Sequence, residues 1–324
     1  MERVLVTGGC GFIGSHLVEA LLSSGCFVTV FDICRWDDPN NCLKFMFRKR
    51  PAKLHFIRGN IRKPGDIKNA TYRGVQVVFH LAAEISIPYS YHFPQEVKRT
   101  NIDGTLNALM AARNAGINRF IHTSSSEVYG SAMNVPMDEN HQLHGQSPYA
   151  ASKIGADKLA ESFYRSYDLP VTTIRPFNVF GPRQSERAII PNIIRQLIGG
   201  ETLSLGNTYP TRDFTFVTDT VRAFILAAEK DETIGREINI GSGKEISVAT
   251  LAERIGGMMG VTINESHCQD RIRPTASEVD RLCSDSSLAK ELIGWSPCVC
   301  LEDGLKETIK WFRAHPDFHG NDRG

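Results

Sequence analysis

The sequence predicts an α/β protein built on a doubly wound parallel sheet, with a smaller α/β part toward the C-terminus. Three observations indicate this fold. Short apolar segments alternate with helical segments, and a glycine-rich turn follows the first apolar segment. From about Gly181, loops marked by proline and glycine become frequent. Unbroken apolar runs of this length are typical of parallel strands that are buried on both faces. Strands that alternate with helices form such sheets, and the helices cover both faces.

The expected strands lie at residues 3–6, 27–31, 53–57, 75–81, 119–122 and 170–176. Helical segments lie between them, for example at residues 16–22 and 105–113. From about Gly181, prolines and glycines mark loops, and an amphipathic helix is expected near residues 301–312. We therefore expect a first domain over residues 1–180, a mostly substrate-binding domain over 181–315 and a polar tail over 316–324. The chain is expected to return to the main sheet near residues 214–241.

A glycine-rich turn joins the first strand to the first helix. Gly8, Gly11 and Gly14 occupy this turn, where backbone N–H groups and the helix N-terminus can hold a pyrophosphate. Asp32 ends the second strand, where a carboxylate can bind the adenine-ribose hydroxyls of NAD. Arg35 could meet the 2′-phosphate of NADP, but Asp32 would repel it. The pattern therefore predicts an NAD-binding Rossmann domain.

Composition gives no reason to invoke other partners. The 324 residues are 41% hydrophobic and 23% charged, and the net charge of +1 does not favour binding to nucleic acid or to an anionic membrane. The chain has no long apolar run, and its first strand begins at Arg3, which leaves no room for a signal peptide. Eight cysteines lack metal-ligand spacing, so we expect reduced thiols, no metal site and a cytoplasmic protein.

Tyr149 and Lys153 indicate the chemistry. Residues four apart on a helix share a face, so the ammonium can lie near the phenol. A nearby positive charge favours the phenolate and should lower the tyrosine pKa toward neutrality, where the group can act as a general base. Serines at 124–126 follow an apolar strand and could hold a substrate oxygen. Taken alone, the spacing of the Tyr and Lys is common and would favour an ordinary amphipathic helix with a lysine at its edge.

These motifs together resemble the extended short-chain dehydrogenase/reductase superfamily, in its NAD-dependent nucleotide-sugar epimerase/dehydratase branch, over nearly the whole chain. The landmarks are the glycines of the turn, His-Leu-Ala-Ala at 80–83, Thr-Asn-Ile-Asp-Gly-Thr at 100–105, Ser125, Tyr149 with Lys153, Arg-Pro-Phe-Asn-Val-Phe-Gly-Pro at 175–182 and Arg-Asp-Phe-Thr-Phe-Val-Thr-Asp at 212–219. One departure is Asn60, where the family usually has an Asp that contacts the adenine. An Asn can still hydrogen-bond there.

The resemblance implies a set of site residues. The catalytic group would be Ser125, Ser126, Glu127, Tyr149 and Lys153. The NAD site would comprise Gly8, Gly11, Phe12, Ile13, Gly14, Asp32, Asn60, Ile61, Leu81, Ala82, Ala83, Asn101, Tyr149, Lys153 and Pro176. A nucleotide-sugar substrate, with a UDP-hexose expected, would contact Glu84, Ser86, Asn178, Arg187, Arg212 and Arg273. Each arginine could instead be a solvated surface charge, and His80 is expected to pack under the cofactor turn.

The triplet Ser125, Ser126 and Glu127 discriminates within the branch. It resembles the Thr-Ser-Glu of GDP-mannose 4,6-dehydratases, and the runs at 87–91 and 145–164 look closest to 4,6-dehydratases acting on UDP-N-acetylglucosamine. The implied reaction oxidises C4 with bound NAD, loses water across C5–C6 with Glu127 as the base at C5, and returns the hydride to C6. The product is a 4-keto-6-deoxy sugar. Ser126 is a poor acid, so we expect it to orient groups or relay a proton.

Several alternatives remain open. UDP-glucuronate decarboxylases share Ser-Glu-Val-Tyr-Gly, but their C6 carboxylate calls for cations, and residues 87–91 supply Pro, Tyr and Ser. Three further hypotheses are a dehydratase that stops at a 5,6-ene product, a UDP-sugar 4-epimerase and a non-catalytic NAD-binding sensor. Glu127 could also be a surface acid or an acid at the start of a helix, without a role in catalysis. The helices near 95–115 and 149–167 resemble a dimer-forming pair, so we expect a homodimer, although their apolar residues could equally cover the sheet.

Overall fold

The predicted doubly wound parallel sheet is present in the structure, a computed structural model that describes residues 1–38, 41–47, 49–71, 74–200, 202–263, 265–267 and 273–320. Seven strands form the sheet in the order β3-β2-β1-β4-β5-β6-β10, and every neighbouring pair is parallel. The strands are β1 (Arg3–Thr7), β2 (Phe27–Asp32), β3 (Leu54–Arg58), β4 (Val77–His80), β5 (Arg119–Thr123), β6 (Val171–Pro176) and β10 (Glu237–Ile240). The order reverses beside β1, where such sheets bind ligands at the carboxyl ends of their strands.

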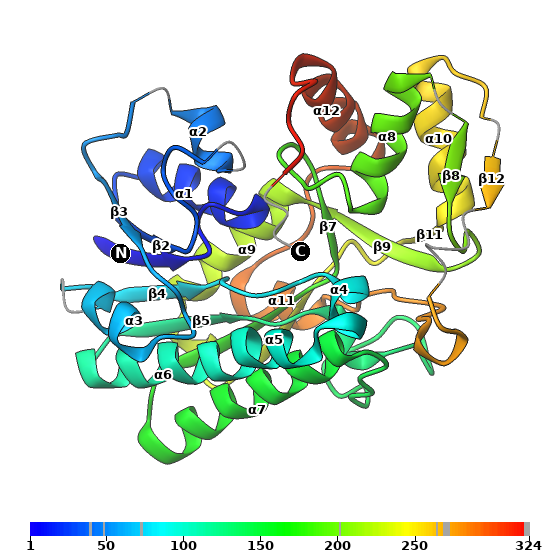
Figure 1. Cartoon of the computed structure of the whole chain (residues 1–324). Coiled ribbons are helices and arrows are strands. Elements are labelled where there is room, and N and C mark those ends of the chain that lie inside the picture. Colours follow the sequence, from blue (N-terminus) through cyan, green and yellow to red (C-terminus); the bar gives the residue numbers. More distant parts are fainter. Residues whose placement is uncertain are drawn as a thin grey trace.

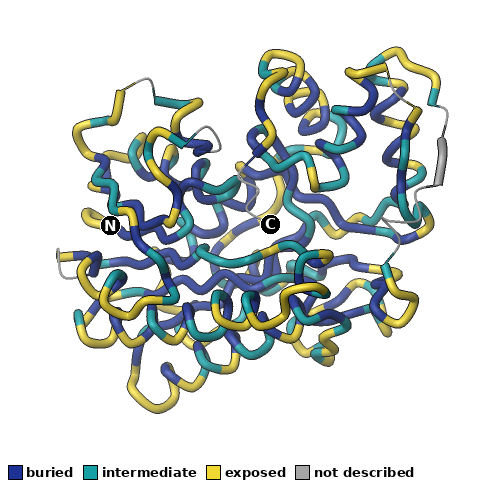
Figure 2. Tube along the Cα trace, in the orientation of Figure 1, coloured by how far each residue is buried: buried dark blue, intermediate teal, exposed yellow. Residues whose placement is uncertain are grey.

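Helices cover both faces of this sheet (Figure 1). One face carries α3 (Pro64–Thr71), α5 (Pro94–Lys98), α6 (Gly104–Ala115) and α7 (Pro148–Tyr167). The other carries α1 (Phe12–Ser23), α9 (Val217–Glu229) and α11 (Ser287–Ile293). Each face encloses its own apolar core, so the strands are buried while the helices expose their outer sides (Figure 2).

The second half of the chain forms smaller sheets and a third core. β7 (Asn178–Phe180), β9 (Thr211–Phe216) and β11 (Glu245–Ser247) form one sheet, and β8 (Leu203–Leu205) pairs with β12 (Glu265–His267). α8 (Ile189–Gly199), α10 (Val248–Met259) and α12 (Leu301–Ala314) contribute to the core beside them. The remaining short elements are α2 (Cys42–Met46), α4 (Ile87–His92), the π-helical turn η1 (Arg99–Asp103) and the 3₁₀ turns η2 (Ser126–Tyr129), η3 (Asp231–Thr233) and η5 (Thr275–Ser277).

The C-terminal residues differ from the expected polar tail where they are described. Phe318 is 1% exposed and packs with Trp311 and Phe312 of α12. Arg195 of α8 donates a 2.8 Å hydrogen bond to the carbonyl of His315 and another to that of Phe318. The Phe318 side chain therefore anchors residues 315–320. The polar composition of this segment did not predict this contact. Residues 321–324 of the expected tail lie outside the described residues.

Three of the cysteines lie together beside the glycine-rich turn. Cys10, Cys34 and Cys42 are fully buried, and Cys10 is hydrogen-bonded to Cys34. Burial raises the pKa of the Cys42 thiol to about 12, which makes it unreactive. Cys268 lies outside the described residues. Within the described part of the chain, no group of three or more His, Cys, Asp or Glu could hold a metal ion, and no helix is long and apolar enough to cross a membrane.

Candidate active site

Helix α7 positions the predicted tyrosine and lysine. Ser147 caps its N-terminus by accepting a 3.1 Å hydrogen bond from the N–H of Ala150, and Pro148 occupies the first turn. Tyr149 and Lys153 are 7% and 5% exposed. The Lys153 ammonium donates a 2.9 Å hydrogen bond to the carbonyl of Thr123, the last residue of β5. The helix therefore brings both groups to the carboxyl end of the strand that precedes the serines.

The serine cluster meets the tyrosine directly. Ser125 caps η2, since its side-chain oxygen accepts a 3.2 Å hydrogen bond from the N–H of Glu127. Its hydroxyl also hydrogen-bonds the Tyr149 side chain. Glu127 is 8% exposed and lies close enough for its charge to act on Tyr149. Ser126 is buried beside them. The structure thus brings the five predicted catalytic residues to one place.

The expected lowering of the Tyr149 pKa is wrong for the chain alone. Burial raises this pKa, and the negative charges of Glu127 and Asp157 raise it further, while only the hydrogen bond with Ser125 opposes the change. Burial removes water from the phenolate, and this cost exceeds any gain from the lysine. Burial also lowers the pKa of Lys153 to about 8. An additional positive charge beside the phenol is therefore required to favour the phenolate.

Asp157 is a buried partner that the sequence interpretation missed. It lies one helical turn after Lys153, and it opposes the effect of burial on the lysine. Its carboxylate accepts hydrogen bonds from His122 Nε2 at 3.1 Å, Ser124 Oγ at 2.8 Å and Arg175 Nη2 at 3.2 Å. Burial works against the ionised form, but these partners keep the pKa of Asp157 below its ordinary value. The signal available in sequence was an acid four residues after the catalytic lysine.

The glycine-rich turn is closely packed on one side and open on the other. Gly8 has φ +70°, and a Cβ there would lie 2.8 Å from the backbone nitrogen of Ala82. A Cβ on Gly14 would lie 2.2 Å from the carbonyl oxygen of Gly8. A Cβ on Gly11 would meet only that oxygen, at 3.4 Å, and Gly11 begins α1 without a side-chain cap. The N-terminus of α1 therefore fits a pyrophosphate that approaches over Gly11.

Asp32 links the turn to the second strand. Its two carboxylate oxygens accept 2.9 Å hydrogen bonds from the N–H groups of Cys10 and Cys34. A carboxylate has further acceptor positions, so these bonds leave Asp32 able to bind ribose hydroxyls. The Asn60 side-chain oxygen accepts from the N–H of Arg62 at 3.0 Å, which fixes the loop after β3. Both predicted adenosine contacts thus also hold their own loops.

A hydrogen-bond chain supports the segment over β4. Thr7 Oγ1 accepts 3.2 Å hydrogen bonds from the N–H groups of Leu81 and Ala82, and it lies 2.8 Å from His80 Nδ1. His80 Nε2 lies 3.1 Å from Thr105 Oγ1. Burial lowers the pKa of His80 well below its ordinary value, so the ring is neutral and joins the two threonines. His80 lies under the turn, and Thr7 is a supporting residue that the motif search overlooked.

Asn101 supports the same region. It belongs to the π-helical turn η1. Its side-chain oxygen accepts a 2.8 Å hydrogen bond from the N–H of Glu84. Its side-chain NH₂ group donates hydrogen bonds to the carbonyl of Glu84 and to Ser152 Oγ, both at 2.9 Å. Its amide groups are thus bonded to protein, so any effect on NAD would pass through residues 83–84. Of the other predicted cofactor contacts, Phe12 and Ile13 begin α1 and Pro176 ends β6, while Ile61 and Ala83 lie in the loops after β3 and β4.

Two predicted substrate arginines lie near Glu127, the predicted base. Arg273 Nη1 is 3.8 Å from a carboxylate oxygen of Glu127 and 3.8 Å from one of Glu278. Arg212 of β9 lies 3.6 Å from the same Glu278 oxygen. Asn178 begins β7, and its buried side-chain oxygen has no hydrogen-bond partner in the described part of the chain. Glu278 was not foreseen, because its partners are distant in sequence.

The remaining predicted substrate contacts gather around the start of α4. Ser86 caps α4 by accepting a 3.2 Å hydrogen bond from the N–H of Tyr89. Burial raises the pKa of Glu84, and the positive charge of Arg187 opposes this. Arg187 itself is exposed. The structure therefore brings these three residues near one another, with Arg187 at the outside.

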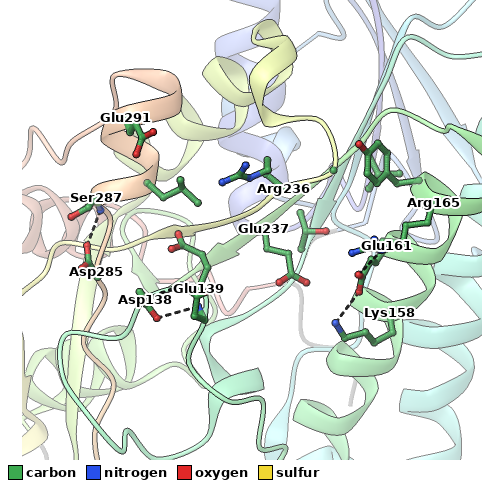
Figure 3. Close-up of a pocket in the computed structure, with 17 residues that line it drawn as sticks. Asp138, Glu139, Lys158, Glu161, Arg165, Arg236, Glu237, Asp285, Ser287 and Glu291 are labelled. Carbon is green, nitrogen blue, oxygen red and sulfur yellow. Dashed lines mark hydrogen bonds and ion pairs between the residues drawn. The ribbon is translucent and has the colours of Figure 1, made fainter.

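A hollow of about 470 Å³ lies away from these residues, between α7 and α11 (Figure 3). Charged side chains from both elements and from residues 138–140 line it, and none of the predicted site residues does. Glu237 of β10 lines the hollow, and its carboxylate lies 2.8 Å from Arg175 Nη2. The buried network that begins at Lys153 and Asp157 thus reaches the surface here.

Comparison with known proteins gives matches over nearly the whole chain. A family model described as GDP-mannose 4,6 dehydratase matches residues 5–308. A UDP-N-acetyl-α-D-glucosaminuronate decarboxylase of Bacillus cytotoxicus is 36% identical, covering 96% of this chain and 98% of its own. A UDP-glucose 4-epimerase of Mycolicibacterium smegmatis is 34% identical, with the same coverage. The crystal structure of DesIV, a dTDP-glucose 4,6-dehydratase of Streptomyces venezuelae solved with NAD bound, gives a TM-score of 0.88 at 30% identity, covering 98% of each chain.

Proposed function

Because the chain belongs to the GDP-mannose 4,6 dehydratase family of NAD-dependent nucleotide-sugar enzymes, we propose that it is a nucleotide-sugar 4,6-dehydratase. The proposed substrate is UDP-N-acetylglucosamine and the proposed product a 4-keto-6-deoxy sugar. One observation carries the dehydratase assignment: Glu127 lies in the same buried site as Ser125 and Tyr149. A 4-epimerase has no step that requires this acid.

The residues of the glycine-rich turn fit NAD. The open side of Gly11 and the uncapped N-terminus of α1 would hold the pyrophosphate, and Asp32 would bind the adenine ribose. The chemistry that NAD supplies when bound is reversible hydride transfer, first from C4 of the sugar and later to C6. Lys153 would bind the nicotinamide ribose. The positive nicotinamide ring would supply the charge that the Tyr149 phenolate lacks in the chain alone.

Tyr149 and Ser125 would act at C4. The Tyr149 phenolate takes the proton of the C4 hydroxyl as this carbon is oxidised to a ketone. Ser125, which already hydrogen-bonds Tyr149, donates to the developing C4 oxygen. Lys153, fixed by the carbonyl of Thr123, adds positive charge beside this oxygen and the phenolate.

Glu127 would act at C5 and C6. A ketone at C4 makes the C5 hydrogen acidic, and the Glu127 carboxylate removes it as a proton. The same proton then goes to the departing C6 hydroxyl, so that water leaves and Glu127 is again a carboxylate. Ser126 is buried beside it and would orient these groups. Hydride addition at C6 would be completed by a proton from solvent at C5, while Tyr149 would release to solvent the proton that it took from the C4 hydroxyl. Loss of one water and transfer of one hydride from C4 to C6 then balance without net oxidation.

The test is turnover of UDP-N-acetylglucosamine in deuterated water, followed by mass spectrometry and proton NMR. We expect loss of water, a new C6 methyl group and deuterium at C5. Recovery of the C4 epimer with no loss of water would reject the dehydratase. If this substrate is unchanged, the same assay with dTDP- and GDP-hexoses separates an error in the substrate from an error in the reaction.

A decarboxylase is the second candidate, because the Bacillus cytotoxicus relative is a decarboxylase at 36% identity. In that reaction a C4 ketone expels carbon dioxide from a C6 carboxylate. A site of this kind should present cations to the carboxylate, and the corresponding segment, α4, contains no lysine or arginine. Carbon dioxide release from UDP-glucuronate or its N-acetylated analogue would favour this candidate over the dehydratase.

A further inference from the structure

Glu278 lies between the two arginines proposed to bind the substrate. One of its carboxylate oxygens is 3.6 Å from Arg212 Nη2 and 3.8 Å from Arg273 Nη1. The other accepts a 2.9 Å hydrogen bond from the Asn207 side chain. The Glu278 side chain is only 6% exposed. A nearly buried carboxylate therefore neutralises the positive charge on which anion binding would depend.

The arginines are held by charge more than by hydrogen bonds. Arg273 Nη1 is buried and has no hydrogen-bond partner among the described residues, although it lies 3.8 Å from both Glu278 and Glu127. Arg212 Nη1 donates a 3.0 Å hydrogen bond to the carbonyl of Thr211, while its Nη2 faces Glu278 at 3.6 Å. A guanidinium makes its strongest contacts as paired, short hydrogen bonds to carboxylate or phosphate. The present contacts leave these donors available to a better acceptor.

We propose that Glu278 is an internal counter-anion, which holds Arg212 and Arg273 in place in the free protein and which a nucleotide diphosphate displaces. The proposal rests on the proposed function, because the displacing group is the diphosphate of a nucleotide sugar. The carboxylates of Glu127, Glu278 and Asp280 act on Arg212, and the first two also act on Arg273, so a diphosphate has to compete with these negative charges for the guanidinium groups.

Glu278 is the carboxylate that a diphosphate would displace. It forms ion pairs with both arginines, at 3.6 Å and 3.8 Å, whereas Glu127 forms one with Arg273 at 3.8 Å and acts on Arg212 from farther away. Asp280 adds a further negative charge near Arg212. Glu278 thus has a role in tuning substrate affinity, outside the chemical step.

The experiment is isothermal titration calorimetry of the NAD-loaded full chain with UDP, dTDP and GDP. A nucleotide that binds the wild type should bind Glu278→Gln about tenfold more tightly, because a competing negative charge is gone. A merely structural role for Glu278 would weaken binding instead.

Two control variants make the outcome specific. Glu278→Asp keeps the carboxylate and should bind with an affinity close to that of the wild type. Glu302→Gln removes an exposed glutamate that is paired with Arg254, and its affinity should match the wild type. Equal or weaker binding by Glu278→Gln would overturn the counter-anion role alone. If none of the three nucleotides binds to the wild type, both the counter-anion role and the proposed function are rejected.

Discussion

Asp157 follows Lys153 by one turn of α7, and its carboxylate raises the pKa of the buried lysine. Burial lowers the pKa of Lys153 to about 8, and the carboxylate of Asp157 opposes this shift. Asp157 is itself held by His122, Ser124 and Arg175. The charges of His80 and His122 do not compete, because burial lowers the pKa of both rings. Asp157 thus raises the pKa of Lys153 against the effect of burial and favours the protonated lysine.

Replacement of Asp157 by Asn should move the alkaline limit of activity to lower pH. The protonated lysine is the useful form, so activity is present below the Lys153 pKa and is lost as the pH rises through it. Without Asp157 this pKa falls below about 8, and the limit should shift down by about one unit or more. The pH profile of kcat/KM measures the shift.

Two controls accompany this variant. Glu161→Gln changes an exposed ion pair on the same helix and should leave the pH profile unchanged. Asp157→Asn also leaves Arg175 without one buried partner, so a loss of several kcal/mol of stability is expected and should be measured by thermal unfolding. If folded Asp157→Asn protein has the same alkaline limit as the wild type, Asp157 does not control the pKa of Lys153.

Glu127→Gln should permit oxidation at C4 and block the loss of water. The amide cannot take the C5 proton, and a positioned proton transfer is worth about 10²–10⁴ in rate. Single-turnover experiments should therefore show reduced nicotinamide accumulating without a 4-keto-6-deoxy product. Glu139→Gln changes a half-buried glutamate that lines the hollow and serves as the control. Full dehydratase activity in Glu127→Gln would remove Glu127 from the mechanism.

Local sequence patterns were sufficient to predict the sheet and the glycine-rich turn on which the site is built. The alternating strands gave the sheet, and the spacing of Gly8, Gly11 and Gly14 placed a turn at the start of α1, because these features depend on neighbours in sequence. Glu278 could not be predicted in this way. Its partners Arg212 and Asn207 lie on the preceding strand and loop, and only folding brings them together.

Burial was the second property that the sequence did not provide. Tyr149 has a lysine at the expected position, yet burial reverses the expected direction of its pKa shift. The π-helical turn that carries Asn101 has no simple sequence signature and was also not foreseen. Phe318 stabilises a segment that composition alone marked as a polar end. In each case the deciding quantity is the three-dimensional environment of one side chain.

Tyr149 should ionise more easily when the oxidised cofactor is bound. Burial raises its pKa in the chain alone, and the positive nicotinamide ring should oppose this, so the phenolate should form at lower pH with oxidised than with reduced cofactor. Ultraviolet difference spectra recorded against pH measure the phenolate, and Tyr149→Phe identifies its signal. Equal titration in the two cofactor states would contradict the proposed source of the charge.

The apolar side chains exposed on α6 and α7 should mediate a dimer. Leu106 and Met110 are 37% and 41% exposed on α6, and Tyr164 and Tyr167 are 36% and 47% exposed on α7. Two adjacent helices with such faces fit an interface between two copies of the chain. Leu106→Lys with Met110→Lys should convert the dimer to a monomer in sedimentation experiments. A wild-type protein that sediments as a monomer would reject the interface.

Gly11→Ala and Gly14→Ala should separate cofactor binding from folding. A Cβ on Gly11 meets only the carbonyl oxygen of Gly8 at 3.4 Å, and its φ of −78° suits alanine, so stability should fall by less than about 1 kcal/mol. The added methyl group would occupy the open side where the pyrophosphate approaches, and NAD affinity should fall at least about tenfold.

A Cβ on Gly14 would lie 2.2 Å from the carbonyl oxygen of Gly8, so Gly14→Ala should lower the free energy of unfolding by about 1–3 kcal/mol or more. Chemical denaturation without cofactor and calorimetric NAD titration measure the two effects, and wild-type NAD affinity in Gly11→Ala would show that the cofactor does not approach over this residue.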